Sequence, residues 1–180
     1  LGMASLLPHK ELSIQEESDI VLVDGIASSG VQGRTKILAA NSGVRATAVK
    51  AEDFMKMNSA TEGRDFVKQY DLIYIYHNRI DKTGDDKTSE ERVFESVEDE
   101  LQFLMDMMKK IANMNGNNMF ITSDHGFLYQ HNTLDESDFS KSNHSGQIWK
   151  ENRRFVIGKE LVGDSSTLAF RGAQLNISSD

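Results

Sequence analysis

Short apolar runs alternate along this chain with segments whose apolar residues recur at helical spacing. The first run, 19–23, has consecutive rather than alternating apolar residues, which predicts a strand covered on both faces and ending at Asp24-Gly25. This alternation of strand-like and helix-like segments favours an α/β layer architecture. The other expected strands are 44–49, 72–76, 119–122 and 154–157, and the expected helices are 34–40, 51–57, 61–70 and 89–113.

The segment 89–113 gives the clearest helical signal. Thr88 and Glu91 have the spacing of a capping box, in which each side chain accepts a free backbone N–H at the helix start. The apolar positions beyond it predict a face that packs on the core, and the acidic positions predict a solvated face. The apolar set is Val93, Phe94, Val97, Leu101, Leu104, Met105, Met108 and Ile111, and the acidic set is Glu90, Glu91, Glu95, Glu98, Asp99 and Glu100.

The order of strand, helix and strand predicts that 72–76 and 119–122 run parallel, joined by a right-handed crossover. The polar clusters after both strands would then share one edge of the sheet, where open α/β sheets bind ligands. Carboxylate oxygens and imidazole nitrogens bind divalent metals, so this edge is a candidate metal centre. The first cluster holds Asp81 and Asp85, and the second holds Asp124, His125 and Gly126.

Each cluster also has an ordinary structural interpretation. Asp124 could cap the next turn, with His125 beside it on the surface, and Asp81 and Asp85 could belong to a common turn around Gly84. Their value as metal ligands therefore depends on whether the two clusters converge.

The other histidines and one arginine pair are weaker candidates. His144 lies in a segment rich in Ser, Asn and Gly, which predicts a loop that could reach back over the sheet edge as a further ligand. His77 ends a strand, and we interpret it as a hydrogen-bonded structural residue. Arg153 and Arg154 could clamp a phosphate, or form only a solvated strand edge. His9 and His131 are interpreted as surface residues.

The amino-acid composition limits the kinds of metal site, nucleophile and binding partner that this chain can have. The 180 residues include 20 Lys and Arg against 28 Asp and Glu, a net charge of −8, and no Cys. Thiolate metal sites, disulfides and a cysteine nucleophile are excluded, so any metal must bind Asp, Glu or His. The negative charge argues against wrapping duplex DNA by phosphate neutralisation, but it allows a nucleic-acid substrate held through metal ions. No apolar run approaches the ~18 residues of a membrane span, and no export signal is seen, so we expect a cytoplasmic protein without a membrane partner.

Several motifs resemble the PglZ family of the alkaline phosphatase superfamily, a component of the bacterial phage-defence systems called phage growth limitation and BREX. They are Tyr74-Ile75-Tyr76-His77-Asn78-Arg79-Ile80-Asp81, Thr83-Gly84-Asp85 and Ile121-Thr122-Ser123-Asp124-His125-Gly126-Phe127-Leu128-Tyr129, together with 1–8 and 23–25. The resemblance covers about residues 1–160. It implies a three-layer α/β sandwich with a mostly parallel sheet, of which residues 1–180 would form the C-terminal portion.

The resemblance also implies two divalent metal ions bridged by a phosphoester, with zinc as the first expectation and Mn or Mg as alternatives. Asp81 and His144 would serve one ion, and Asp124 and His125 the other. Asp85 stands where the family pattern has a His, which makes the first site harder. The family's nucleophilic Ser or Thr would lie N-terminal to Leu1, so this portion is expected to be inactive on its own.

The sequence is therefore compatible with two functions. The first is part of a phosphoester hydrolase acting on a monoester or on nucleic acid, with Arg153 and Arg154 as candidate substrate-binding residues. The second is a non-catalytic interaction module that docks other defence proteins through surfaces such as the helix at 89–113.

Overall fold

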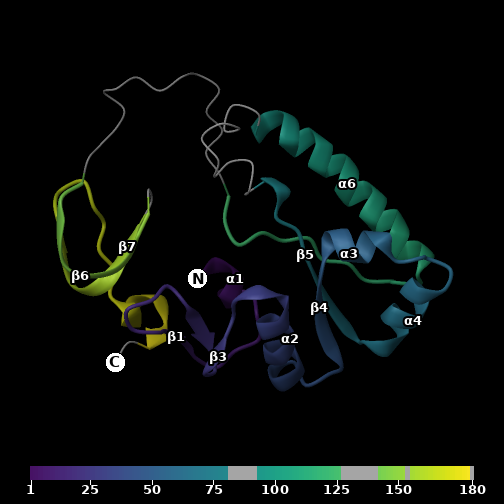
Figure 1. Cartoon of the computed structure of the whole chain (residues 1–180), viewed down its shortest axis with the longest axis horizontal. Helices are drawn as coiled ribbons and strands as arrows, with labels where there is room; N and C mark the ends of the chain where they lie inside the picture. Colours follow the sequence, from purple (N-terminus) through teal and green to yellow (C-terminus); the bar gives the residue numbers. More distant parts are fainter. Residues whose placement is uncertain (81–92, 127–141, 153–154, 179–180) are drawn as a thin grey trace. The chain divides into compact units, whose positions relative to one another are not determined.

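The computed structural model describes residues 1–80, 93–126, 142–152 and 155–178, with side chains in the helix from residue 96. The chain divides into two compact units (Figure 1). The first unit contains residues 1–37 and 124–180, and the second contains residues 38–123. The boundary at Ile37 falls inside helix α2, Gly30–Asn41, which is longer than the expected 34–40.

The first unit holds a small mixed sheet of order β3-β2-β1-β8. Strand β1 pairs antiparallel with β2 and parallel with β8, and β2 pairs antiparallel with β3. Its buried side chains include Leu12, Val21, Val23 and Ile177, and Leu7, from the segment after α1, is also buried. The element bounds are α1 Gly2–Ser5, β1 Leu12–Ile14, β2 Val21–Val23, β3 Ile26–Ala27 and β8 Ile177–Ser178.

The prediction that 19–23 is a strand covered on both faces was wrong. The strand is only Val21–Val23, and its burial alternates as in a half-buried antiparallel strand. Asp24 and Gly25 have φ of 48° and 78°, the positive values that a two-residue hairpin turn requires, so the chain folds back into β3. The Asp24-Gly25 pair was therefore a hairpin signal, which outweighed the consecutive apolar residues.

The first unit also contains an antiparallel hairpin of β6, His144–Glu151, and β7, Val156–Gly163. Asp164 follows β7 and closes the open end of the hairpin. Its carboxylate accepts the backbone N–H of Asn143 at 2.7 Å and both the backbone N–H and hydroxyl of Ser166 at 2.9 and 2.5 Å. These hydrogen bonds lower the pKa of the Asp164 carboxyl to about 2. A 3-10 helix, η3 Gly172–Leu175, leads into β8.

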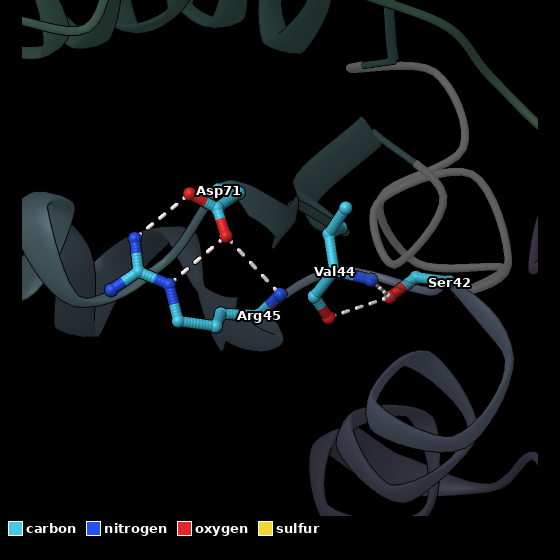
Figure 2. Close-up of polar contacts among 4 residues, drawn as sticks. All are labelled: Ser42, Val44, Arg45 and Asp71. Carbon is cyan, nitrogen blue, oxygen red and sulfur yellow. Dashed lines mark hydrogen bonds and ion pairs between the residues drawn. The ribbon is translucent and has the colours of Figure 1, made fainter.

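The second unit is built on a parallel pair, β4 Ala46–Lys50 and β5 Leu72–Tyr76, joined through α3 Ala51–Lys56 and α4 Glu62–Gln69. The first of these two strands lies close to its predicted range, and the second matches it. Figure 2 shows how the register is fixed at the start of both strands. The Arg45 guanidinium donates to both carboxylate oxygens of Asp71, at 2.8 and 3.0 Å, and the Arg45 backbone N–H donates to one of them at 3.3 Å. In addition, the backbone N–H of Asp71 donates to the Arg45 carbonyl at 2.8 Å.

Helix α6, Val93–Asn113, confirms the predicted long helix and packs on this unit's core (Figure 1). Met107 and Met114 are buried with Val49, Ala51 and Phe54. The predicted apolar face was only partly right. Leu104 and Ile111 pack on the core, whereas Leu101, Met105 and Met108 are 59, 53 and 43% exposed, and Glu100, predicted to be solvated, is 1% exposed. Apolar residues lie on two faces of this helix, so the pattern could not select the buried one.

The predicted strand at 119–122 was also wrong. Residues 117–122 have no regular structure and pair with no strand among the described residues. Phe120 is 94% and Ile121 60% exposed, because an apolar run forms a buried strand only beside a hydrogen-bonded neighbour. The described sheets are one mixed, one parallel and one antiparallel, which is α/β but does not confirm a mostly parallel sandwich. None of the described helices combines the length and apolar character that a membrane span needs.

Candidate metal centre

Asp124 and His125 lie together in the first unit, immediately after the irregular segment 117–122. The Oδ1 of Asp124 is 3.9 Å from the Nε2 of His125, and their side chains are 21% and 47% exposed. The His125 Nδ1 lies 3.0 Å from the Gly126 carbonyl oxygen. Because a carbonyl oxygen can only accept, Nδ1 carries the hydrogen, and in the neutral ring the lone pair is on Nε2, the nitrogen near the carboxylate.

Helix α1 approaches Asp124 so closely that only glycine fits at its first position. A Cβ at Gly2 would stand 2.9 Å from the Asp124 Cβ and 3.0 Å from its backbone oxygen. Real Cβ atoms essentially never come this close to such fixed atoms, so the α1 backbone forms one wall beside the carboxylate. Sequence reasoning missed this contact. The available signal was a glycine inside a helix, where glycine costs stability unless close packing requires it.

His144 does not lie in the predicted loop. It is the first residue of β6, opposite Gly163, because its neighbours continue into the hairpin ladder. Its side chain is 14% exposed, and its Nε2 is 3.5 Å from the Oε1 of Glu151. The Nδ1 of His144 is buried and has no hydrogen-bond partner among the described residues.

Four predicted site residues lie outside the described residues. They are Asp81, Asp85, Arg153 and Arg154. The described part of the chain contains no group of three or more His, Asp or Glu side chains arranged to hold a metal ion. Of the predicted ligands, the structure thus brings together Asp124 and His125. A carboxylate oxygen and an imidazole nitrogen are donors that divalent metals bind. Metal-binding histidines usually donate their other ring N–H to a carbonyl or carboxylate, as the His125 Nδ1–H does here.

A second polar cluster, at the end of β5, was not predicted. The Nε2 of His77 is 2.6 Å from the Oε2 of Glu100, an ion pair by distance whose angles are not those of an aligned hydrogen bond. The Nε of Arg79 is 3.0 Å from the Oε1 of Glu100. The Glu100 side chain is 2% exposed, and the His77 ring stacks on Phe103 at a centroid distance of 5.0 Å. His77 is therefore a structural residue at the strand end, as we interpreted it, but its Nε2 contact is an ion pair and not the expected hydrogen bond.

Comparison with known families gives one match that spans almost the whole chain. The sequence model described as the BREX system PglZ alkaline phosphatase-like domain matches residues 1–176. This chain belongs to the PglZ family. The match extends beyond the 1–160 expected from the motifs and includes the end of β7 and the 3-10 helix η3, whereas β8 follows its last residue.

Two curated relatives carry the same description in their names. The alkaline phosphatase-like protein BrxZ of Escherichia coli O9:H4 (strain HS) is 39% identical over 171 residues, which cover 91% of this chain and 19% of the relative. The alkaline phosphatase-like protein PglZ of Bacillus cereus (strain H3081.97) is 35% identical over 171 residues, 94% of this chain and 20% of the relative. The chain thus spans about a fifth of either PglZ relative. No solved structure gives a significant match.

Proposed function

We propose that this PglZ chain forms the C-terminal portion of a metal-dependent phosphoester hydrolase domain in a cytoplasmic phage-defence protein. The observation that carries the proposal is the contact of Gly2 with Asp124, a candidate ligand that stands beside His125. The resemblance to the PglZ family implies a nucleophilic Ser or Thr before Leu1, and α1 begins beside Asp124. We therefore propose that the nucleophile is supplied near this carboxylate and that residues 1–180 alone would not turn over substrate.

The proposed ligands divide between two ions. By the family resemblance, Asp124 and His125 would hold one, and Asp81, Asp85 and His144 would hold the other, while Arg153 and Arg154 would orient the phosphoester. Mixed nitrogen and oxygen donors favour zinc, with Mn or Mg as alternatives because of the extra carboxylate of Asp85. Bound divalent ions would stabilise the attacking and leaving oxygens during phosphoryl transfer. The protein must hold these donor atoms in place. For Asp124 this is done at Gly2, where the α1 backbone leaves no space for the carboxylate to shift toward the helix.

The test uses the full-length natural protein with both Asp124 and His125 changed to Ala. We expect bound zinc, measured by elemental analysis, to fall by about one ion, and hydrolysis of activated phosphomonoesters and diesters to be lost. The control is Asp53→Ala, an exposed carboxylate in α3 of the second unit, which should keep both. Unchanged metal content in the double variant would contradict the proposal, and so would multiple turnovers by the 180-residue chain alone.

A second candidate function is a non-catalytic interaction module, favoured by one observation. Leu101, Met105 and Met108 form an exposed apolar row on α6, at the spacing of one helix face. Phage protection in cells separates the two candidates. Loss of protection in the Asp124→Ala protein favours hydrolysis. Retained protection in that protein, with loss when the three apolar residues become Gln, favours docking of another defence protein.

A further inference from the structure

Helix α6 has apolar residues on two faces, and only one of these faces packs on the core. The core face contacts the second unit through residues such as Met107. The other face carries three large apolar side chains that are 59, 53 and 43% exposed: Leu101, Met105 and Met108. We call these three residues the α6 row. Single exposed apolar residues are common on proteins, but a contiguous group of them marks an interaction surface.

The spacing of the α6 row fits another helix as its partner. Leu101, Met105 and Met108 follow each other at intervals of four and three residues. Ala112, which is also exposed, continues the series with an interval of four. Alternating intervals of three and four are the apolar pattern through which two helices pack along their length. A helix lying along α6 would therefore cover the whole row with one seam.

Two charges of opposite sign border the α6 row, one toward each end. Glu98 precedes Met105 by seven residues and Lys109 follows it by four, so both lie on the same side of α6 as Met105. Both charged side chains are exposed. Lys109 also lies 3.2 Å from Asp106, but an exposed pair of this kind contributes little and can be exchanged. The exposed face is thus acidic at one end, apolar in the middle and basic at the other end.

This order of charges is complementary to itself when two copies of α6 lie antiparallel. Glu98 of each copy then approaches Lys109 of the other, and the two Met105 side chains meet near the twofold axis. In a parallel arrangement each charge would face its own kind, which is repulsive. Most protein dimers are symmetric and use the same surface on both copies. A second copy therefore accounts for the charges as well as for the apolar row.

We propose that the α6 row is the centre of an antiparallel interface between two copies of this protein. The inference does not depend on the proposed hydrolysis. It competes with the second candidate function, since one row cannot bind a second copy and another defence protein at the same time. A standard interface buries about 800 Å² on each partner, more than three half-exposed side chains provide, so we expect a weak dimer that depends on protein concentration.

The test measures the mass of the full-length natural protein by sedimentation over a wide range of concentrations, in which wild type should pass from monomer to dimer. Met105→Glu should stay monomeric, because it places two negative charges side by side at the twofold axis. Glu98→Lys and Lys109→Glu each bring like charges together at two symmetric places, and each should raise the dissociation constant about 10-fold. The protein with both changes has opposite charges again and should recover most of the wild-type affinity.

Asp99→Lys is the matched control for Glu98→Lys. It makes the same change of charge one residue away, at an exposed position on the opposite side of α6 from the row, and should leave the dissociation constant unchanged. A dimer that Met105→Glu does not weaken would overturn the proposal, and a double charge variant no better than the single ones would overturn the antiparallel arrangement.

A protein that is monomeric at every concentration would also overturn the proposal. The rate at which peroxide oxidises Met105 and Met108 in that monomer would identify the alternative, with the buried Met107 as the internal reference. Slow oxidation would mean that another part of the same protein covers the α6 row. Fast oxidation would leave the row open to a different protein.

Discussion

The two units each hold one carboxylate in place, and they do so by different physical means. In the first unit Asp124 is held by shape, because the α1 backbone at Gly2 leaves no space beside it. In the second unit Glu100 is held by charge, because His77 and Arg79 contact its two oxygens inside the core. Asp124 keeps 21% of its side chain exposed, and Glu100 keeps 2%.

This difference distinguishes a residue that can bind an ion or a substrate from a residue that can only hold other side chains in place. A carboxylate with exposed surface can bind an ion or a substrate without first losing a partner. A buried carboxylate with both oxygens engaged cannot, and its effect must pass through the residues it holds. Substitutions should therefore affect binding in the first unit and local order in the second.

The largest effect is expected for Gly2→Ala. The new Cβ would overlap the Cβ and backbone oxygen of Asp124, neither of which can rotate away, so α1 and Asp124 must separate. Overpacking of this kind costs about 1–3 kcal/mol. Metal content of the full-length protein should fall as in the Asp124 and His125 double variant, with faster hydrogen exchange in 1–8.

Gly126→Ala is the matched control for Gly2→Ala. No described atom lies within 4 Å of a Cβ at Gly126, and the substitution keeps the Gly126 carbonyl oxygen beside the His125 Nδ1, so it adds the same methyl group without a clash among the described residues. Equal metal content in the two variants would show that Gly2 does not position Asp124.

A matched pair of histidine substitutions should have opposite effects, one mainly on stability and the other mainly on metal content. His77→Phe keeps the ring that stacks on Phe103 but removes one partner of Glu100, so we expect a stability loss of about 1–3 kcal/mol. His125→Phe changes a side chain that is 47% exposed, and its stability effect should stay within about 0.5 kcal/mol.

Thermal unfolding and elemental analysis of the two histidine variants check this contrast. Metal loss should be greater for His125→Phe, and the fall in melting temperature greater for His77→Phe. The reverse ranking would mean that His125 is structural and that the first unit has no ligand there.

Sequence reasoning succeeded where the signal was local. The helix at 93–113 and the strands at 46–50 and 72–76 follow from runs of apolar residues with the right spacing. The Asp124-His125 motif stays a predicted pair of ligands. It failed where the outcome depends on a distant partner. The run at 119–122 has the composition of a strand, but a strand also needs a neighbour.

Contacts between distant residues also explain what the sequence could not reveal about the site. Glu100 has the same type as the exposed Glu98, and only its contact with the segment 77–79, more than twenty residues earlier, distinguishes the two. Gly2 and Asp124 are 122 positions apart. For Asp81, Asp85, Arg153 and Arg154, which the structure does not describe, the sequence assignments stay predictions.

The smallest effect is expected from two exposed aspartates, one in each unit. Hydrogen bonds from Ser166 and Asn143 lower the pKa of Asp164 to about 2, and hydrogen bonds from Arg45 lower the pKa of Asp71 (Figure 2). A carboxyl whose pKa is lower in the folded state than its ordinary 3.8 stabilises the fold above 3.8, and this contribution is lost as the pH falls through the folded value. The advantage of wild type over Asp164→Asn should therefore be full near neutral pH and shrink between about pH 4 and pH 2.

Thermal unfolding of the full-length protein and both Asn variants across that range is the measurement. The Asp71→Asn curve should approach wild type in the same direction, since its carboxyl is also exposed and screened by water. Each carboxylate accepts three hydrogen bonds, but those on Asp164 are 2.5 to 2.9 Å long and those on Asp71 2.8 to 3.3 Å, so the pH-dependent difference should be larger for Asp164. A difference that grows as the pH falls would show that these carboxyls do not contribute to the fold as ions.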